Sequence, residues 1–213
     1  MRFADRRTAG ELLGKTVAAL GPSRPMVAAL PRGGVPVGFE VARVLGCELD
    51  VLVVRKVGVP FHPELAMGAV AEGDVVIENR EVIDAIGIDE QEFTAAVALE
   101  MKTLALRLDE YRETVPGVDP TGKTVIVVDD GLATGSTALA AIQGLRRRGA
   151  SQVWLAVPVA PPEVIPMLEK AADRVIVLAS PRRFTAVGIW YRDFSQTSDD
   201  EVRDLLRRSR TSS

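Results

Sequence analysis

The chain has 213 residues and a mass of 22.9 kDa, which suffices for one full hydrophobic core and is too little for two domains of ordinary size. Its hydrophobic fraction of 47% and charged fraction of 26% exclude an intrinsically disordered protein, and a formal net charge of -3 excludes a strong overall attraction to nucleic acid or an anionic membrane. Any anion-binding site therefore depends on local residues.

Residue usage also bears on cellular location. Cys47 is the only cysteine and His62 the only histidine, so an intrachain disulfide is excluded and a structural zinc site would have to draw on His62. The N-terminal residues lack the apolar run of a signal peptide, and no apolar stretch approaches the roughly 20 residues that a membrane span requires. We therefore expect a cytoplasmic protein with no membrane or nucleic-acid partner.

Hydrophobic periodicity divides the chain into alternating helices and strands. The first half predicts, in chain order, a helix at 5–20, a strand at 26–30, a helix at 34–45, a strand at 49–54, a loop followed by a strand or hairpin at 57–74, a short strand at 75–77 and a long helix at 89–114. The second half predicts strands at 124–128, 153–157 and 175–178, with helices at 135–148 and 162–171 between them. This alternation indicates an α/β fold with a mainly parallel, doubly wound sheet and flanking helices, which binds ligands at the carboxyl ends of its strands. We expect one domain over 1–213, with a helical insertion at about 75–120.

The strongest motif is the segment 125–137, which reads VIVVDDGLATGST. A buried strand leads into Asp129 and Asp130, whose carboxylates can accept hydrogen bonds from two neighbouring hydroxyl groups. Gly131 and Gly135 let the backbone turn tightly, and the free N–H groups at the start of the next helix favour an anion. The segment has neither the lysine of a Walker loop nor a Gly-x-Gly-x-x-Gly pattern. It therefore predicts a site for a sugar 5-phosphate.

This motif resembles the phosphoribosyl pyrophosphate signature of the type I phosphoribosyltransferases, and residues 26–194 follow the order of elements in that family. The resemblance implies transfer of a 5-phosphoribosyl group from phosphoribosyl pyrophosphate to a nitrogenous base, with release of pyrophosphate. It implies Mg²⁺ as cofactor, held through the pyrophosphate and the ribose. Asp129 and Asp130 would be catalytic and bind the ribose hydroxyls. The residues around the 5-phosphate would be Ala133, Thr134, Gly135, Ser136 and Thr137.

A second motif, LPRGGVPVG at 30–38, again joins a strand end, a glycine turn and a helix start. It resembles the pyrophosphate loop of the family, which implies that Arg32, Gly33 and Gly34 face the leaving group and that the Arg32–Gly33 peptide bond is cis. Arg55 and Lys56 follow the predicted strand 49–54 and would add cations at the same edge of the sheet. In this interpretation Arg32 and Lys56 join the catalytic set. Residues 57–74 correspond in position to a mobile loop of related enzymes, and the role of His62 within it stays open.

The segment 181–194 gathers aromatic residues in a chain with few of them, and it resembles the small hood of the purine phosphoribosyltransferases. The resemblance implies base-binding roles for Phe184, Val187, Trp190 and Asp193. Either Phe184 or Trp190 could be the ring that stacks on the base, and packing of both rings in the core fits the sequence equally well. Enzymes for 6-oxopurines carry a lysine after the strand that corresponds to 153–157, where this chain has Pro158-Val159-Ala160. Hypoxanthine and guanine are therefore not the expected bases.

Two other functions stay open. A non-catalytic regulator could use the same loops to sense phosphoribosyl pyrophosphate or a nucleotide, although no helix-turn-helix or concentrated basic face is evident. A hydrolase of phosphorylated sugars could use the phosphate loop, but no nucleophile or metal cluster accompanies it. The expected partners are phosphoribosyl pyrophosphate and a small base, and the sequence does not decide whether the chain forms a homodimer.

Overall fold

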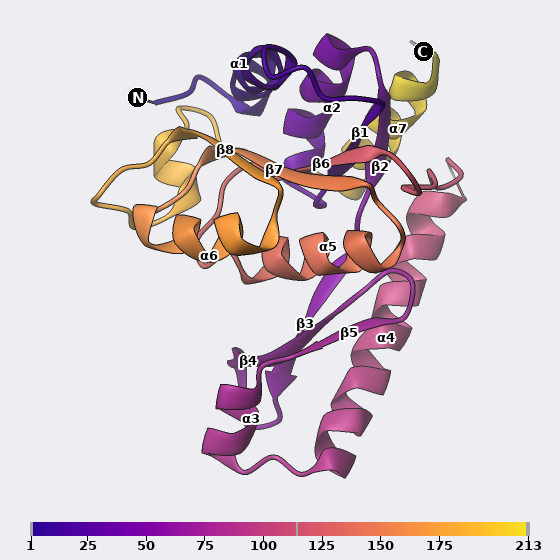
Figure 1. Ribbon diagram of the computed structural model, residues 1–213, viewed down its shortest axis with the longest axis vertical. Helices are drawn as coiled ribbons and strands as arrows, with labels where there is room; N and C mark the ends of the chain where they lie inside the picture. Colours follow the sequence, from indigo (N-terminus) through magenta and orange to yellow (C-terminus); the bar gives the residue numbers. More distant parts are fainter. Residues whose placement is uncertain (1, 114, 212–213) are drawn as a thin grey trace.

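A computed structural model describes residues 2–113 and 115–211 of the chain, and it contains a five-stranded parallel sheet in the order β2-β1-β6-β7-β8 (Figure 1). The strands are β1 (Pro25–Ala29), β2 (Glu48–Val51), β6 (Thr124–Val128), β7 (Gln152–Val159) and β8 (Arg174–Ala179). The parallel α/β fold predicted from the sequence is thus confirmed. Because β1 and β6 are neighbours, the loops that follow them meet at one edge of the sheet.

Helices cover both faces of this sheet. One face carries α1 (Arg6–Ala18), α2 (Gly34–Leu45) and α7 (Asp199–Thr211), and the other carries α5 (Ser136–Arg147), the short turn η1 (Pro162–Val164) and α6 (Ile165–Ala171) (Figure 1). Alternate residues of β1 supply two separate cores, with Val27 and Ala29 on the α1 and α2 side and Met26 and Ala28 on the α5 side. Within the described ranges, no helix is both long and apolar enough to cross a bilayer.

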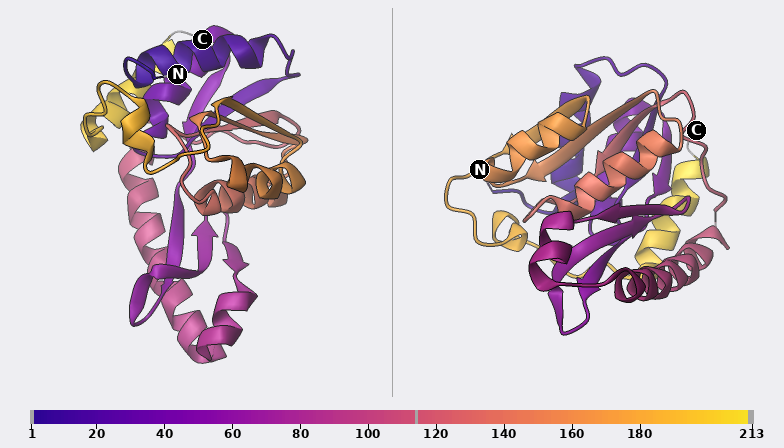
Figure 2. Two further views of the ribbon diagram at one scale, coloured as in Figure 1. Left: turned by 90° about the vertical axis from the view of Figure 1, so that its left-hand side faces the viewer. Right: turned by 60° about the horizontal axis from the view of Figure 1, so that its bottom comes forward.

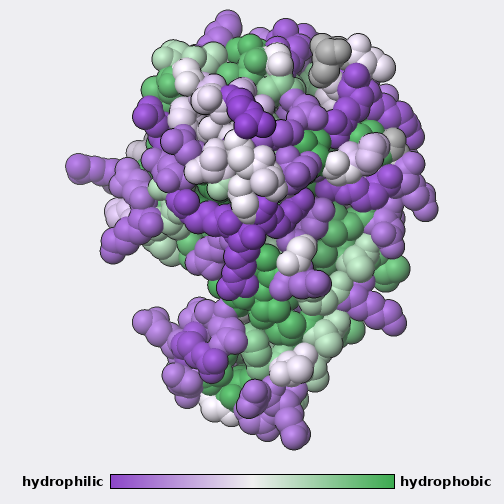
Figure 3. Space-filling model, turned by 45° about the vertical axis from the view of Figure 1, so that its right-hand side comes forward, coloured by the Kyte–Doolittle hydropathy of each residue, from purple (hydrophilic) through white to green (hydrophobic). Residues whose placement is uncertain are grey.

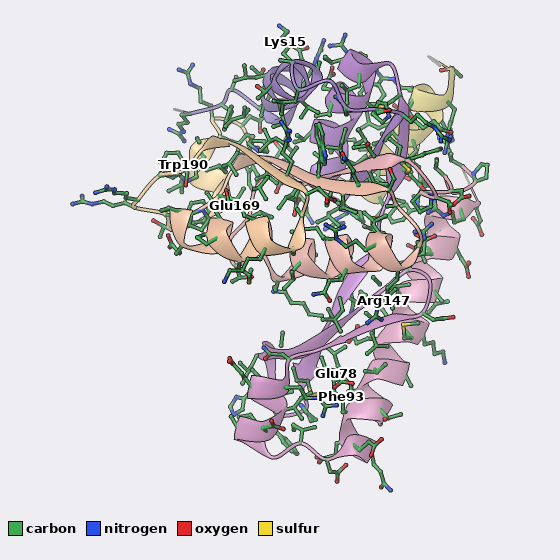
Figure 4. All side chains as sticks on the ribbon, in the orientation of Figure 1. Lys15, Glu78, Phe93, Arg147, Glu169 and Trp190 are labelled. Carbon is green, nitrogen blue, oxygen red and sulfur yellow. The ribbon has the colours of Figure 1, made fainter. Side chains whose placement is uncertain are left out.

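An arm projects from the sheet layer and contains most of the segment 54–112 (Figures 1 and 2). Its antiparallel sheet is formed by β3 (Val54–Val59), β4 (His62–Ala71) and β5 (Val75–Glu78), packed beside α3 (Arg80–Ile86) and α4 (Glu90–Arg112). Phe93 of α4 lies inside the arm (Figure 4), close against Gly68, where a Cβ atom would lie 3.3 Å from the ring. Hydrophobic side chains gather on the arm surface (Figure 3), where Leu99 is 64% exposed and Leu106 is 58% exposed.

The observed helix starts follow the capping chemistry of the sequence. The Asp5 side chain accepts a hydrogen bond from the Thr8 N–H at 2.7 Å and begins α1. Asp89 and Glu92 form a reciprocal capping box that begins α4, while Thr114, the expected last residue of this helix, lies outside the described residues.

Two helices, α3 and α7, were not predicted. The segment 57–74, expected as a loop followed by a strand or hairpin, forms a hairpin that begins without a preceding loop, since β3 and β4 pair on either side of a turn at Pro60.

Candidate functional site

The two glycine-containing loops predicted from the sequence lie against each other. The Leu30 N–H donates to the Val128 carbonyl at 2.9 Å, which aligns the ends of β1 and β6. A Cβ atom on Gly34 would lie 2.7 Å from that carbonyl oxygen, and a Cβ atom on Gly33 would overlap the Asp130 carboxylate. Glycine is therefore required at both positions for the loops to approach so closely. The cis peptide bond of this turn joins Pro31 and Arg32, so the expectation of a cis bond between Arg32 and Gly33 was wrong by one residue.

The two carboxylates that follow β6 are held in different environments. Asp129 accepts a hydrogen bond from the Asp130 N–H at 2.8 Å, and burial, aided by the charge of Asp130, raises the pKa of Asp129 well above its usual value. Burial also raises the pKa of Asp130, although the neighbouring Arg6 opposes this rise. The site thus holds two adjacent acidic groups whose charged forms are disfavoured by burial.

Arg6, at the start of α1, is a part of this site that the motifs did not indicate. Its Nε lies 2.8 Å from Oδ2 of Asp130, and its guanidinium stacks 3.9 Å from the centroid of the Phe194 ring. The buried hydroxyl of Tyr191, also not predicted, donates to the main-chain carbonyl of Asp130 at 2.5 Å. The N-terminal helix and the segment near 191–194 therefore both hold Asp130 in position.

The loop at 133–137 leads from the end of β6 into α5 and carries three hydroxyl side chains. Gly135 has φ of 74° and precedes the first residue of α5, so the chain enters the helix through a left-handed residue. The hydroxyl oxygens of Thr134 and Ser136 lie 3.0 Å apart, and Thr134 is exposed while Ser136 and Thr137 are partly exposed. The hydroxyl groups thus lie close to the N–H groups at the start of α5, beside the exposed Ala133.

A pocket of about 260 Å³ lies beside the loop that follows β1. Its lining residues are Pro31, Arg32, Val53, Val54, Arg55, Arg107, Tyr111 and Asp199. Arg32 and Arg55 were predicted for this position, and the structure brings them together. Lys56, the next residue of β3, is exposed and does not line the pocket, because successive side chains of a strand point to opposite sides. Arg107, Tyr111 and Asp199 come from α4 and α7 and were not predicted.

Most of the predicted hood residues pack near the carboxylates. Phe184, Val187 and Trp190 are half-buried beside Phe3 and Tyr191 in a small apolar cluster on the body of the molecule, where Figure 4 labels Trp190. A Cβ atom on Gly131 would lie 2.6 Å from Cγ1 of Val187, so the hood directly contacts the loop after β6.

The polar atoms of the hood differ in exposure. Among the described residues, no hydrogen-bond partner reaches the buried Nε1 of Trp190. Asp193 is exposed, and hydrogen bonds from the side chain and the N–H of Ser195 lower the pKa of its carboxyl group. His62, at the start of β4, is also exposed and lies in the arm.

Comparison with known proteins identifies the family. Residues 6–186 match the model of the phosphoribosyl transferase domain. Proteins provisionally named phosphoribosyl transferases from two strains of Mycobacterium tuberculosis, CDC 1551 and H37Rv, are 45% identical to the chain over 207 residues, which is 97% of this chain and 47% of theirs. The chain thus spans about half the length of these curated relatives.

Solved structures agree with this result. A protein from Thermus thermophilus is 42% identical, with a TM-score of 0.88 over 98% of this chain and 99% of its own. An Aquifex aeolicus protein shares the fold at 14% identity, with a TM-score of 0.51 over 86% of this chain and 78% of its own. Helix α7, which carries Asp199, follows the range that the family model matches. The chain belongs to the phosphoribosyl transferase domain family.

Proposed function

We propose that this protein transfers the 5-phosphoribosyl group of phosphoribosyl pyrophosphate to a nitrogenous base and releases pyrophosphate. One observation carries the proposal, namely the direct contact between the Arg32–Gly34 turn and Asp130. This contact joins the turn that borders the arginine pocket to the carboxylates that follow β6, and the hydroxyl loop at 133–137 comes three residues later in the chain. A 5-phosphate, a ribose and a diphosphate require these three kinds of group in the same order.

In the proposed reaction a nitrogen of the base attacks C1 of the ribose, and the bond from C1 to the diphosphate oxygen breaks. Negative charge then grows on the leaving group, where Arg32, Arg55 and the N–H groups of residues 32 and 33 would stabilise it, while the Gly34 N–H donates to the Leu30 carbonyl. Lys56 points away from this pocket on β3, so the diphosphate-binding role expected of it from the sequence is not part of this proposal. Asp129 and Asp130 would hold the ribose hydroxyls, and their charge would favour the positive ring of the transition state.

Magnesium fits this donor set. The chain offers the adjacent carboxylates of Asp129 and Asp130, whereas the described residues contain no cluster of three or more His, Cys, Asp or Glu side chains. Mg²⁺ retains waters and binds substrate phosphates with one or two carboxylates in many proteins. It would therefore take most of its oxygen ligands from the diphosphate and the ribose, with these carboxylates beside it, and would neutralise charge on the leaving group.

The hood at 181–194 is the proposed base subsite. Val187 contacts Gly131 beside the carboxylates, and Phe184 and Trp190 offer apolar rings close by, with Asp193 at the exposed rim. The end of β7 lies beside the loop after β6, because the buried Val159 carbonyl accepts a hydrogen bond from the Leu132 N–H at 2.9 Å. No lysine stands at 158–160 to read a 6-oxo group, and we therefore propose a base other than hypoxanthine or guanine.

A non-catalytic sensor of phosphoribosyl pyrophosphate is the second candidate, and the position of Arg6 favours it. A ribose hydroxyl that binds Asp130 would compete with the guanidinium of Arg6 at the start of α1. Displacement of Arg6 would transmit occupancy of the site to that helix. Turnover with a base distinguishes the enzyme from the sensor.

Calorimetry with phosphoribosyl pyrophosphate, with and without Mg²⁺, tests the proposed function. The wild type should bind in the presence of Mg²⁺, and the double variant Asp129→Asn/Asp130→Asn should lose binding while remaining folded. An assay for released pyrophosphate with a panel of bases should then identify the acceptor. Binding without release for any base would favour the sensor, and the absence of binding by folded wild type would reject the ligand.

A further inference from the structure

An acidic side chain of the C-terminal helix lies inside the arginine pocket. Oδ2 of Asp199 is 3.5 Å from Nη1 of Arg32 and 3.6 Å from Nη1 of Arg107. Oδ1 of the same carboxylate accepts a hydrogen bond from the Tyr111 hydroxyl at 2.8 Å. Asp199 thus joins the loop after β1 to helix α4, and it takes the place that an anion bound between the two arginines would occupy.

The contacts of Asp199 with the arginines are weak by their geometry. A charge-assisted hydrogen bond between a guanidinium and a carboxylate is usually about 2.7–2.9 Å long, whereas here one oxygen serves two guanidinium groups at 3.5 and 3.6 Å. The side chains of Arg32 and Arg107 are also 40% and 45% exposed, so water screens the attraction. An anion with more charge and more oxygens could displace the carboxylate from both arginines.

The charge of the pocket favours such an anion. Its lining contains three arginines, Arg32, Arg55 and Arg107, against the single carboxylate of Asp199. Arg55 and Arg107 are oriented by glutamates of α4, since Arg55 Nε donates to Glu100 at 2.8 Å and Arg107 Nη1 donates to Glu110 at 3.1 Å. Neither glutamate lines the pocket. A diphosphate has enough oxygens to contact all three guanidinium groups at once.

We propose that Arg107 is a further diphosphate-binding residue and that Asp199 is an internal anion which the diphosphate displaces from Arg32 and Arg107. This inference rests on the proposed function of the site. Asp199 lies beyond residues 6–186, so the match to the family does not assign it a role. Because pyrophosphate is also the product, a competing carboxylate weakens its retention and favours its release.

The proposed roles of Asp199 and Arg107 predict opposite effects of their substitution on the affinity for inorganic pyrophosphate. Calorimetry on the full chain with Mg²⁺ measures this affinity. Asp199→Asn should tighten binding about threefold or more, because it removes the competing charge while an amide oxygen can still accept from Tyr111. Arg107→Gln should weaken binding about tenfold through loss of a charge-assisted contact, and Arg107→Lys should weaken it less.

Asp200→Asn is the matched control, because it makes the same charge change one residue away on a side chain that is 90% exposed and paired with Arg203. It should change affinity by less than about twofold, since exposed charges are well screened. Weaker binding by Asp199→Asn, equal gains in both aspartate variants, or unchanged affinity in Arg107→Gln would overturn the inference. If any of these outcomes is found while phosphoribosyl pyrophosphate still binds through Asp129 and Asp130, the inference fails but the proposed function survives. If neither the wild type nor Asp199→Asn binds pyrophosphate, the diphosphate site itself fails.

Discussion

The guanidinium of Arg6 forms an ion pair with the carboxylate of Asp130 across 124 residues of sequence, with an Nη2 to Oδ2 distance of 2.8 Å. Both side chains are largely buried, at 12% and 13% exposure. Burial raises the pKa of Asp130, and Arg6 is the neighbour that opposes this rise most strongly by favouring the charged form. The first helix therefore supplies the counterion for an acid of the candidate site.

Arg6→Gln should lower the free energy of unfolding at pH 7 by about 2–3 kcal/mol, because it leaves a buried carboxylate without its cation. The variant should raise the pKa of Asp130 further. The loss of stability should therefore shrink as the pH falls through the carboxylate pKa, where Asp130 becomes neutral and no longer requires a cation. Urea unfolding at pH 7 and at about pH 4.5 measures both effects.

Arg7→Gln is the control for this prediction. The Arg7 side chain is 74% exposed, and its contacts with Glu11 and Glu40 are 3.5 and 3.4 Å long. It should change the stability by no more than about 0.5 kcal/mol. An equal loss in both variants would show that the buried pair has no special contribution.

Asp129→Asn should make the protein more stable at pH 7 and less able to bind phosphoribosyl pyrophosphate. Burial, followed by the charge of Asp130, raises the pKa of Asp129 in the folded state. For such an acid, the stabilising contribution is complete below the ordinary pKa of the unfolded chain and is lost as the pH rises through the folded pKa. At pH 7 the buried Asp129 carboxyl group therefore lowers the stability of the wild type. Replacing it with an amide should raise the free energy of unfolding by about 1 kcal/mol.

Asp119→Asn is the contrasting variant. Hydrogen bonds from the N–H and the hydroxyl of Thr121 lower the pKa of Asp119, and this carboxylate therefore stabilises the folded state above its unfolded pKa. The variant should be slightly less stable at pH 7 and should bind ligand normally. Chemical unfolding across pH 4–8 compares the two, and a loss of stability in Asp129→Asn would contradict the conclusion that burial of the Asp129 carboxyl group destabilises the folded state.

The sequence allowed a close prediction of the sheet and of the main loops. Strand β6 has the predicted bounds, as does α2, because uninterrupted apolar runs and helical periodicity mark them clearly. Parallel strands carry their following loops to the same edge, so the contact between the Gly33 turn and Asp130 follows from topology. These features depend on neighbours in sequence or on the regular order of elements.

The partners that complete the site could not be predicted in this way. Arg6 reaches Asp130 from the N-terminal helix, and Asp199 reaches Arg32 from the C-terminal one. No local pattern encodes such pairings, since they depend on how the helices pack on the sheet. Helix α7 itself left a signal, because Val202, Leu205 and Leu206 are buried at helical spacing within an otherwise charged segment.

Gly135→Ala should reduce both stability and affinity for phosphoribosyl pyrophosphate. Gly135 has φ of 74°, a region where a Cβ atom costs about 1–2 kcal/mol, and the added carbon would lie 3.3 Å from Leu168 and Met167. The strain should shift the first turn of α5 and its N–H groups. Calorimetry and urea unfolding measure the two losses.

Gly21→Ala separates backbone strain from binding. Gly21 has φ of 61° and open space around the position of its missing Cβ atom, so the substitution should lower stability by a comparable amount. It lies after α1, outside the loops of the site, and should leave affinity unchanged. A similar loss of affinity in both variants would mean that binding simply follows global stability.

Arg112→Met should destabilise the protein more than any of the other variants, because Arg112 anchors α4 to the parallel sheet. Its guanidinium contacts the carboxylate of Asp50, which is 3% exposed, and Nη2 lies 3.3 Å from Glu72. Without Arg112, Asp50 would keep only neutral partners among the described residues, the N–H groups of Val51 and Val118, each at 2.8 Å. The single variant leaves a buried charge and should lose about 3–5 kcal/mol in urea unfolding.

The double variant Asp50→Asn/Arg112→Met should recover part of this loss, since it removes both charges together. Helix α4 also carries Arg107 and Tyr111 to the arginine pocket, so looser anchoring should weaken pyrophosphate binding in the single variant. Calorimetry at a temperature where both variants are folded measures this link. Unchanged pyrophosphate affinity would mean that contacts within the arm, rather than Arg112, hold Arg107 in place.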